Sequence, residues 1–278
     1  GKVGADDAGD FVTGFLRENG LDVSGVRKVD GVPTSFTDVM TVASTGERTF
    51  FNMHGADSML TPDDIDPASL GCGLFHLGYL LLLDGLDAED EEFGTKAARL
   101  LAKVRAAGIK TSVDIVSEQS ARFARVVRPS LRHCDYVVIN EVEGSIATGL
   151  PAGCEDGKVS VACLRRICEG LFGLGVKEQV VVHSPELSVS LDKSGNFTAV
   201  PSLDLPKGWI RGSVGAGDAF CAGMLYSFAR GMSSEEGLRL ASCAAAMNLS
   251  VGDSVSAARS LSDTMELDAR FPRKPLCT

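Results

Sequence analysis

Residues 212–220 form a glycine-rich stretch, Gly-Ser-Val-Gly-Ala-Gly-Asp-Ala-Phe, that leads into an apolar helical pattern. Glycines in front of a helix let main-chain N–H groups approach an anion, and the positive end of the helix dipole adds to the attraction. Asp218 lies in the first predicted turn, where a carboxylate can take the proton of a hydroxyl that attacks a bound phosphate. An ordinary glycine-rich turn followed by a helical Asp explains the same residues, so the stretch alone leaves both interpretations open.

Polar residues also follow the predicted strand 136–139. Asn140, Glu141 and Glu143 stand where this strand ends and a helix begins. Asn is a favoured N-cap residue, and the helix dipole stabilises acidic residues in a first turn. Taken alone, this second pattern indicates helix capping.

The glycine-rich stretch resembles the second signature of the ribokinase-like (phosphofructokinase B) carbohydrate kinase family. That signature reads Asp-Thr-x-Gly-Ala-Gly-Asp, and residues 215–218 match its last four positions. The resemblance implies that Gly215, Ala216 and Gly217 form an anion hole for the transferred phosphoryl group and that Asp218 is the catalytic base. It also implies that ATP is the phosphoryl donor.

Asn140 and Glu143 match the Asn-x-x-Glu motif of the same family, upstream of the glycine-rich stretch as in the family. The motif implies that Asn140 and Glu143 organise Mg²⁺, water and the nucleotide phosphates, with Glu143 as the metal-binding residue. Oxygen ligands delivered through water suit Mg²⁺, because this ion dehydrates reluctantly. The order of the two motifs favours this role over capping alone.

The sequence departs from the family pattern at two places near the nucleotide. Gly212 stands where the signature has Asp, and Ser213 replaces Thr but keeps a hydroxyl. Residues 183–187, His-Ser-Pro-Glu-Leu, take the place of Thr-Leu-Gly-x-x-Gly, a loop near the nucleotide. The resemblance therefore implies that Ser213, Ser184 and Glu186 lie at the ATP site, although this loop has lost the usual glycine.

Three further segments resemble parts of the family. Residues 1–9 match a G-x-V-G-x-D-x-x-G stretch, and residues 46–50 with 55–56 are similar to a lid hairpin and the substrate-facing turn after it. Such a lid would exclude water; a surface hairpin for dimer contact is the alternative, and both can hold together. The helix 244–248 resembles the wall of the adenine pocket, which places Asn248 at ATP, although a close-packed Ala-rich helix explains the pattern equally well.

Apolar strands alternate with amphipathic helices over most of the chain, which predicts a mostly parallel sheet with helices on both faces. In such sheets, ligands bind outside the carboxyl ends of the strands. We expect strands at 35–43, 48–53, 73–80, 110–115, 136–140, 179–183, 187–191 and 198–200, and helices at 8–19, 91–107, 118–127, 141–148, 159–172, 217–229 and 234–249.

The expected fold class is α/β, a ribokinase-like three-layer αβα arrangement with a mostly parallel central sheet and a small β lid. Residues 1–24 and 57–278 would form the kinase domain, and residues 25–56 the hairpin lid. Members of the family begin with a further strand and a Gly-Gly segment that supplies a sugar-binding Asp. Since the sequence starts at Gly1, this N-terminal strand is expected to be missing from it.

The overall charge limits the partners. The 278 residues contain 27 Lys and Arg against 37 Asp and Glu, without a basic run, which argues against binding along a nucleic-acid backbone. No apolar stretch reaches the roughly 20 residues of a membrane span, and no secretory signal is visible. We expect a cytoplasmic protein that binds a small sugar-like molecule, neither nucleic acid nor membrane, and that forms a homodimer, if any, through the lid.

The cysteines and histidines give no metal or disulfide signal. The eight cysteines show no C-x-x-C pairing and several lie in apolar runs, which favours reduced thiols in the core. His54, His76 and His133 have no metal-ligand spacing and are interpreted as structural. His183 could contact a ligand, but a lone His at a strand end is more often simply hydrogen-bonded.

Two other functions stay open. A sugar- or nucleotide-binding regulatory homologue that kept the fold and lost the chemistry would explain Gly212 and the altered loop 183–187, and a nucleoside kinase would share the same motifs. ADP release measured against sugars and nucleosides separates these functions. A Rossmann-type oxidoreductase fits poorly, because the glycine-rich stretch lies near the C-terminus and lacks the G-x-G-x-x-G form.

Overall fold

The computed structural model describes residues 1–42, 48–117, 122–153 and 158–276. Within these residues, six strands form a central sheet in the order β12-β11-β10-β9-β8-β5. Strands β5, β8, β9 and β10 are parallel, and β11 and β12 extend the sheet as antiparallel strands. Their bounds are β5 Leu74–Leu80, β8 Lys110–Ile115, β9 Tyr136–Asn140, β10 Gln179–His183, β11 Leu187–Asp192 and β12 Phe197–Pro201.

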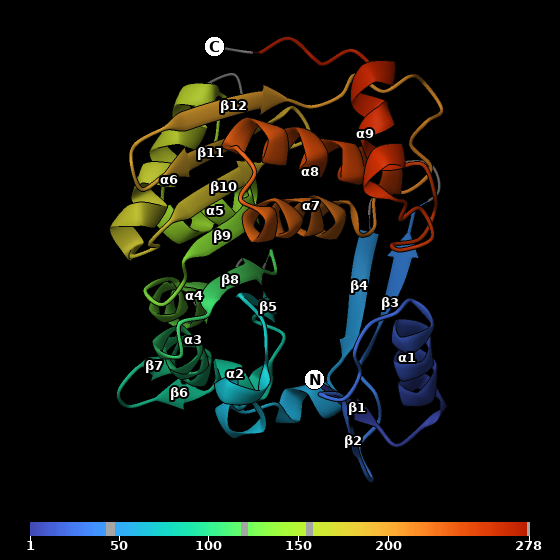
Figure 1. Cartoon of the computed structure of the whole chain (residues 1–278), viewed down its shortest axis with the longest axis vertical. Helices are drawn as coiled ribbons and strands as arrows, with labels where there is room; N and C mark the ends of the chain where they lie inside the picture. The colour runs from blue at the N-terminus through green and yellow to red at the C-terminus, as the bar shows by residue number, and fades with distance from the viewer. Residues whose placement is uncertain (43–47, 118–121, 154–157, 277–278) are drawn as a thin grey trace.

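Helices cover both faces of this sheet (Figure 1). Successive residues of a strand point to opposite faces: in β10, Val180 and Val182 join one core, whereas Val181 joins the other. The first core contains α3 Lys96–Ala106, α4 Arg122–Leu131, α5 Glu141–Thr148 and α6 Val161–Leu174, and the second contains α7 Ala216–Arg230 and α8 Ser234–Asn248, with α9 Leu261–Arg270 against α8. The expected three-layer αβα class is confirmed.

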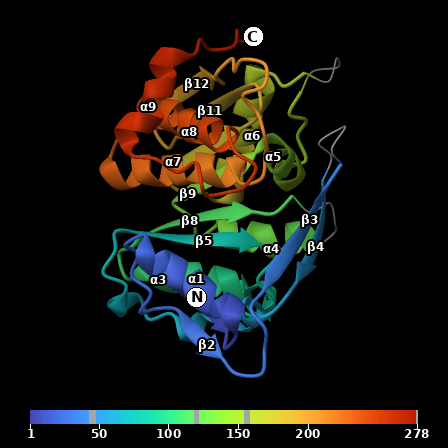
Figure 2. The ribbon, with the colours of Figure 1, turned by 90° about the vertical axis from the view of Figure 1, so that its right-hand side faces the viewer.

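The N-terminal part forms two small sheets of its own. β1 Lys2–Gly4 pairs in parallel with β2 Arg27–Val29, and α1 Asp7–Glu18 lies between them in the chain. β3 Phe36–Thr41 and β4 Arg48–Met53 form an antiparallel hairpin, as expected, although its turn at 44–47 lies outside the described residues. The arrowheads of β5 and β8 point toward this hairpin (Figure 2), so it stands at the carboxyl ends of the parallel strands.

The predicted start of the helix expected at 91–107 is wrong. Residues 89–95 form a small hairpin, β6 Glu89–Asp90 with β7 Gly94–Thr95, and α3 begins only at Lys96. Gly94 has a φ of 85°, a left-handed conformation that suits glycine, and the Thr95 side chain accepts a hydrogen bond from the Ala98 N–H as an N-cap. The cap therefore fixes the start of the helix inside a continuous amphipathic pattern.

Other boundaries also differ from expectation. The helix expected at 118–127 is described from Arg122 to Leu131, while 118–121 lie outside the described residues. Helix α9 was not expected; Ser260 caps its first turn by accepting from the Asp263 N–H. Short helical turns also connect β4 to β5 and follow β5: η1 Ala56–Met59, η2 Pro62–Asp64, η3 Pro67–Ser69 and α2 Asp84–Asp87.

Two expectations from composition can be compared with the described part of the chain. Its six cysteines are free thiols, and four of them are buried, as expected; Cys154 and Cys277 lie outside that part. Across the same residues, none of the helices combines the length and apolar character required to cross a bilayer.

Candidate active site

Helix α7 begins at the edge of the central sheet with an uncapped first turn. Gly215 is the N-cap residue, with a φ of 79° and no side chain to cap the helix. The Ala219 N–H donates to the Gly215 carbonyl at 2.8 Å, the first helical bond. Among the described residues, no protein acceptor is found for the N–H groups of Gly217 and Asp218. These amides are the donors that the start of a helix leaves without an internal partner, and they can bind an anion.

Close packing explains two of the glycines in this stretch. A Cβ at position 215 would lie 2.6 Å from the Ser254 Cβ, so the tight contact and the left-handed φ both require glycine. A Cβ at Gly212 would lie 2.8 Å from the carbonyl oxygen of Val251. The departure from the family's Asp at position 212 is therefore a packing feature of this chain, whose backbone leaves no room there for a carboxylate.

The Asp218 side chain is exposed in the first turn of α7 and accepts a hydrogen bond from the hydroxyl of Tyr79. Tyr79 lies near the end of β5 in the left-handed region, with a φ of 56°, which is uncommon for a residue other than glycine. Its N–H donates to Asp114 Oδ1 at 2.6 Å, and this bond helps to hold the unusual conformation. Burial and the neighbouring Asp218 carboxylate raise the pKa of the Tyr79 phenol, which keeps it a donor at neutral pH.

Asn140 and Glu143 cap helix α5 reciprocally. The Asn140 side chain accepts from the Glu143 N–H at 2.8 Å, and the Glu143 carboxylate accepts from the Asn140 N–H at 3.0 Å. The other carboxylate oxygen accepts from the Ser117 hydroxyl at 2.7 Å. Glu143 is buried, which raises its pKa to about 7. Asn140 and Glu143 therefore cap helix α5, and any further role of the two residues is in addition to this capping.

The polar groups around Glu143 are compatible with Mg²⁺. They are the Glu143 carboxylate, the Asn140 side-chain amide and the Ser117 hydroxyl, and each carboxylate oxygen keeps a second lone pair after accepting one hydrogen bond. Burial and existing hydrogen bonds leave little room for a directly bound ion. Contact through water, the mode that Mg²⁺ often uses, fits this arrangement.

His183 lies between the two motifs. In the register of β9 and β10 it is paired with Asn140, and its Cε1 would be 3.8 Å from a Cβ at Gly217. Its ring packs against Phe220 with centroids 4.5 Å apart. Burial lowers the pKa of His183 to about 4, so the imidazole is neutral at pH 7. The two motifs, far apart in the sequence, thus meet at one edge of the sheet.

Residues 183–187 comprise the last residue of β10, a tight turn at 184–186 and the first residue of β11. The Ser184 hydroxyl accepts from the Glu186 and Leu187 N–H groups at 3.2 Å, and Glu186 pairs with Lys274 at 3.2 Å. Burial, and to a lesser degree the charge of Glu186, raise the pKa of Glu141 at the start of α5. Ser184 and Glu186 therefore lie beside the α5 terminus, next to the edge that carries Asn140.

Asn248, at the end of α8, is buried and only partly hydrogen-bonded. Its Nδ2 donates to the Ser254 carbonyl at 2.9 Å, while its Oδ1 has no partner among the described residues. Ser254 also packs against Gly215, so Asn248 is connected to the start of α7. Ser213, exposed in the same loop, offers its carbonyl to the Ala216 N–H at a long 3.5 Å.

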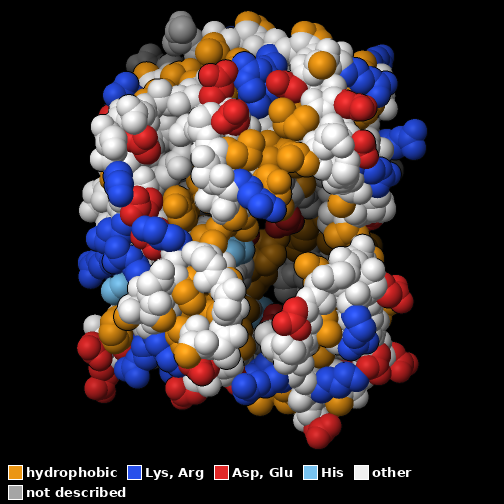
Figure 3. All heavy atoms as spheres, in the orientation of Figure 1, with side chains coloured by type: hydrophobic (Ala, Val, Ile, Leu, Met, Phe, Trp, Pro, Cys, Tyr) orange, Lys and Arg blue, Asp and Glu red, His pale blue; other side chains and the backbone are white. Residues whose placement is uncertain are grey.

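A cavity of about 320 Å³ lies between the β3–β4 hairpin and the end of β5. Figure 3 shows the hollowed face between the lower parts of the molecule and the α7 layer. Polar groups from both sides line the cavity, together with three apolar side chains; the polar members are Ser35, Thr37, Asn52, His54, Asp57 and Tyr79. Because Tyr79 lines this cavity and also contacts Asp218, the cavity adjoins the α7 terminus.

A second cavity, of about 370 Å³, lies at the opposite edge of the sheet. It is lined near the starts of β8 and β9 by Lys110, His133 and Asp135, among others. Ligands of parallel sheets bind at the carboxyl ends of the strands. The larger volume therefore does not mark the candidate site, which is the cavity under the hairpin.

Sequence reasoning missed Tyr79 and Asp114, both part of this site. Tyr79 follows a glycine inside an apolar strand, and nothing local distinguishes it from a residue that packs in the core. Asp114 gave a weak signal, as an acidic residue inside an otherwise buried strand. Tyr79 contacts both Asp114 and Asp218, and Asp218 lies more than a hundred positions from either residue, so only the fold brings the three together.

Comparisons with known proteins agree with this geometry. The pfkB family of carbohydrate kinases matches residues 1–259. The 5-dehydro-2-deoxygluconokinase of Shouchella clausii (strain KSM-K16) is 24% identical over 96% of this chain and 79% of its own length. The probable fructokinase-3 of Arabidopsis thaliana is 36% identical, over 30% of this chain and 25% of its own length.

A solved structure shows the same fold. The ribokinase of Arabidopsis thaliana, complexed with ribose and ATP, superposes with a TM-score of 0.75, at 22% identity, over 96% of this chain and 80% of that one. The three-layer αβα arrangement is thus the ribokinase-like fold.

Proposed function

Since the chain belongs to the pfkB family of carbohydrate kinases, we propose that it transfers the γ-phosphoryl group of ATP to a hydroxyl of a small sugar or sugar-like molecule. The observation that carries this proposal is the contact between Tyr79 and Asp218. A carboxylate beside uncapped helix amides already accepts a hydrogen bond from a hydroxyl, that of Tyr79, which lines the polar cavity. An acceptor hydroxyl in that place would be positioned for deprotonation.

In the proposed reaction, Asp218 accepts the proton of the acceptor hydroxyl. The hydroxyl oxygen forms the new bond to the γ-phosphorus while the bond between that phosphorus and the ADP oxygen breaks. The N–H groups of Gly215, Ala216 and Gly217 hold the transferred group, and the positive end of the α7 dipole stabilises its charge. The acceptor must displace the Tyr79 hydroxyl to reach Asp218.

Asn140 and Glu143 are the residues proposed to hold Mg²⁺, through water. When bound, the ion would neutralise charge on the nucleotide phosphates. The capping box then has a second effect: it fixes both side chains at the end of β9, so that their remaining lone pairs point in defined directions.

ATP is proposed to lie along the same edge, between the turn 184–187 and the end of α8. The argument for Asn248 is its buried Oδ1 without a protein partner, because a buried acceptor of this kind costs stability unless a ligand or water donates to it. The exocyclic amino group of adenine is such a donor. Ser184 and Glu186 would flank the nucleotide from the β10–β11 turn, and Ser213 from the loop before α7.

The acceptor is proposed to bind in the cavity under the β3–β4 hairpin. Its lining mixes hydroxyl, amide, carboxylate and imidazole groups, which suits a molecule with several hydroxyls. His54 Nδ1 lies 2.7 Å from Asp84 Oδ2, and this contact holds the imidazole in place to orient the acceptor. Residues 25–56 would act as the lid over the acceptor, with the rest of the chain as the kinase domain.

The hairpin is also the proposed contact of a homodimer. Phe36, Met40 and Phe51 expose half or more of their surface on a two-stranded sheet. An isolated two-stranded sheet is only marginally stable in water, and apolar side chains on it favour a covering partner. The mass of the protein in solution, measured by light scattering, tests this part of the proposal.

The experiment that tests the function is ADP release from ATP and Mg²⁺ in the presence of single acceptors. The panel includes fructose, ribose, a keto-deoxy sugar acid and inosine, and phosphorylated product is identified by mass spectrometry. We expect product with a sugar, and a strongly reduced rate of its formation with the Asp218→Asn variant. Tight sugar binding without product would instead identify a regulatory homologue, and product with inosine alone a nucleoside kinase.

A further inference from the structure

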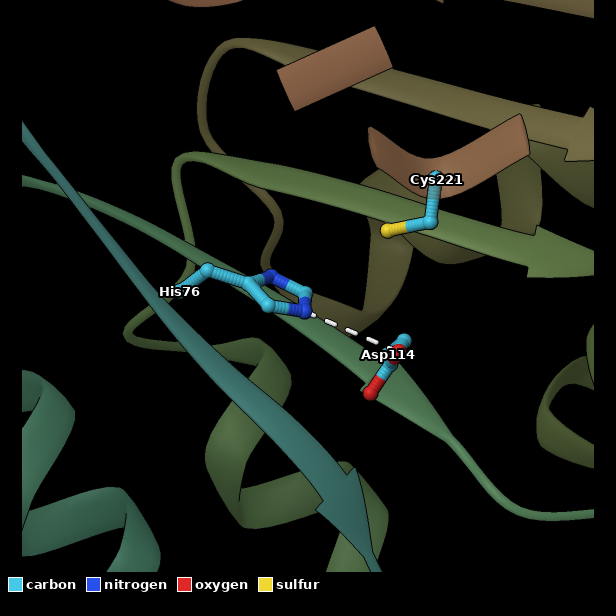
Figure 4. Close-up of side chains that lie close together, drawn as sticks. All are labelled: His76, Asp114 and Cys221. Carbon is cyan, nitrogen blue, oxygen red and sulfur yellow. Dashed lines mark ion pairs between the residues drawn. The ribbon is translucent and has the colours of Figure 1, made fainter. Parts of the chain in front are cut away.

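Three potential metal ligands from distant parts of the chain meet between the sheet and α7. His76 comes from β5, Asp114 from β8 and Cys221 from α7, and one ligand atom of each lies within 4.8 Å of the other two. Figure 4 shows the His76 ring and the Asp114 carboxylate facing each other below the Cys221 thiol. The spacing in the sequence gave no sign of this cluster, and His76 was interpreted as structural.

Hydrogen bonds orient the His76 and Asp114 side chains. His76 Nδ1 lies 3.2 Å from the Ser112 hydroxyl, which turns Nε2 toward Asp114. Asp114 Oδ1 accepts from the Tyr79 N–H, which leaves Oδ2 facing His76 Nε2 at 3.6 Å. That separation is longer than a hydrogen bond between these atoms would be. A second partner on the far nitrogen is the usual arrangement of a metal-binding histidine.

The charge around Cys221 favours a cation. The thiol is buried, and the carboxylates of Asp114, Asp218 and Glu143 are all close enough to act on it electrostatically. In the described ranges, Asp114 forms an ion pair with His76, and none of the three carboxylates forms one with Lys or Arg. A cation beside the thiol would be stabilised by these carboxylates, of which Glu143 is buried and Asp218 is exposed.

A glycine keeps the cluster open. Gly78 lies two residues after His76, on the same face of β5. A Cβ there would lie 3.7 Å from Asp114 Oδ1 and 3.9 Å from His76 Nε2. Any longer side chain at position 78 would cover the two ligand atoms, whereas glycine leaves them accessible from the cleft.

We propose that His76, Asp114 and Cys221 bind a Zn²⁺ ion, or another divalent metal that accepts nitrogen and sulfur ligands. Zn²⁺ binds such atoms at about 2.0–2.3 Å in tetrahedral geometry, which separates the ligand atoms by about 3.3–3.8 Å. The 3.6 Å between His76 and Asp114 is already in this range, and small side-chain rotations bring the thiol to it. The thiol releases its proton to solvent on binding, and water would complete the fourth position. Mg²⁺ prefers oxygen ligands, so the site is distinct from the one proposed at Glu143.

An occupied site would affect catalysis. Cys221 follows Asp218 by three residues, so the ion would place positive charge about one helical turn from the proposed base. That charge opposes proton uptake by Asp218, and Zn²⁺ should slow phosphoryl transfer. This consequence rests on the proposed function, whereas the binding itself does not.

The test is a titration of the purified chain with Co²⁺ as a spectroscopic probe for Zn²⁺, without nucleotide, acceptor or Mg²⁺. We expect a thiolate-to-Co²⁺ absorption band that saturates at one equivalent and disappears when Zn²⁺ is added. The Cys221→Ser variant should lose the band, and His76→Gln should weaken Co²⁺ binding about 10-fold or more, while circular dichroism shows both variants folded. The matched control is Cys72→Ser, which removes an exposed thiol and should keep the band.

Either of two results would overturn the proposal. A band that persists in Cys221→Ser, or no saturable band in the unmodified chain, would show that His76 and Asp114 form only an ion pair. If Cys221→Ser does not fold, the His76→Gln titration decides: unchanged affinity excludes the site. Because no substrate is present, either result is independent of whether the protein is a kinase.

Discussion

Two helices begin at the same edge of the central sheet, and they begin differently. At the start of α5, Asn140 and Glu143 use their own side chains to satisfy the first N–H groups. At the start of α7, Gly215 has no side chain, and the N–H groups of Gly217 and Asp218 have no acceptor in the described chain. Glycine in place of a capping side chain makes a helix end less stable by only roughly a few tenths of a kcal/mol. The α7 terminus therefore keeps its amides available for a ligand, whereas the α5 terminus holds side chains in fixed places.

The two termini therefore contribute to the site in different ways. One terminus fixes the position of two oxygen-bearing side chains, and the other offers main-chain donors beside an exposed carboxylate. The first is held by hydrogen bonds within the helix, and the second by close packing of glycines against the loop around Ser254. Substitutions at the two termini should therefore have different effects on stability and on catalysis.

The largest effect is expected for Asp218→Asn. The change keeps the shape of the side chain but removes the proton acceptor, so kcat should fall about 10²–10⁴-fold. The thermal midpoint should change little, because the side chain is exposed. Steady-state ADP release and differential scanning fluorimetry measure the two quantities. A variant that keeps full turnover on the true acceptor would remove Asp218 from the role of base.

Two glycine variants separate packing from ligand binding at the α7 terminus. Gly215→Ala puts a Cβ against Ser254 and requires a left-handed alanine, which costs about 1–2 kcal/mol from the backbone alone. Gly217→Ala meets only an ordinary contact with His183, so its stability should be unchanged. If the amides hold phosphate, the added methyl group of Gly217→Ala should hinder the close approach of the phosphate to the backbone and lower kcat. Normal turnover in a stable Gly217→Ala protein would contradict the anion hole.

Glu143→Gln tests the capped terminus. Glutamine can keep the capping box but loses the charge, so the Mg²⁺ concentration needed for half-maximal rate should rise by about 10–100-fold. A Mg²⁺ titration of the initial rate gives this value. An unchanged Mg²⁺ requirement would restrict Glu143 to capping.

The same variant has a signature in pH. Burial raises the Glu143 pKa to about 7, above its ordinary value of 4.5, so the folded state binds more protons than the unfolded state between these values. This group therefore lowers stability progressively as pH rises from about 4.5 to 7, and its cost is complete above pH 7. Glu143→Gln lacks this cost. The thermal midpoint of the variant should therefore rise relative to that of the unmodified protein as pH rises. A constant difference between the two midpoints across pH 4.5–8 would contradict the raised pKa.

Tyr79→Phe examines the hydroxyl that now contacts Asp218. Without it, the acceptor has no hydrogen bond to displace, and KM for the acceptor should fall by about 10-fold, the equivalent of one hydrogen bond to a charged group, with kcat retained. Acceptor titrations at saturating ATP measure this change. A higher KM would mean that Tyr79 binds the acceptor instead of yielding to it.

The smallest effect is expected for Ser233→Ala, at a capped helix that starts away from the site. Ser233 and Glu236 form the same type of capping box at the start of α8. Its loss should destabilise the protein by about 1 kcal/mol without changing kcat or KM. Comparison with Glu143→Gln then distinguishes a cap that is only structural from one that also serves the site.

Individual residues show which features of the fold and the site can be predicted from the sequence. The strands and helices that carry the two motifs were predicted within a few residues, because hydrophobic periodicity and capping residues act locally. The start of α3 was missed because Thr95 and Gly94 interrupt a pattern that is amphipathic throughout. The fold class followed from the alternation of strands and helices together with the family signature.

Which helix starts with free amides and which starts with a cap depends on neighbours along the chain, so both features can be read from the amino acids alone. The contact of the Tyr79 hydroxyl with Asp218, the lack of space for a carboxylate at Gly212 and the convergence of His76, Asp114 and Cys221 depend on the tertiary fold. These contacts join separate strands and a helix, whose relative positions are set by the packing of two whole cores. No local pattern records that packing.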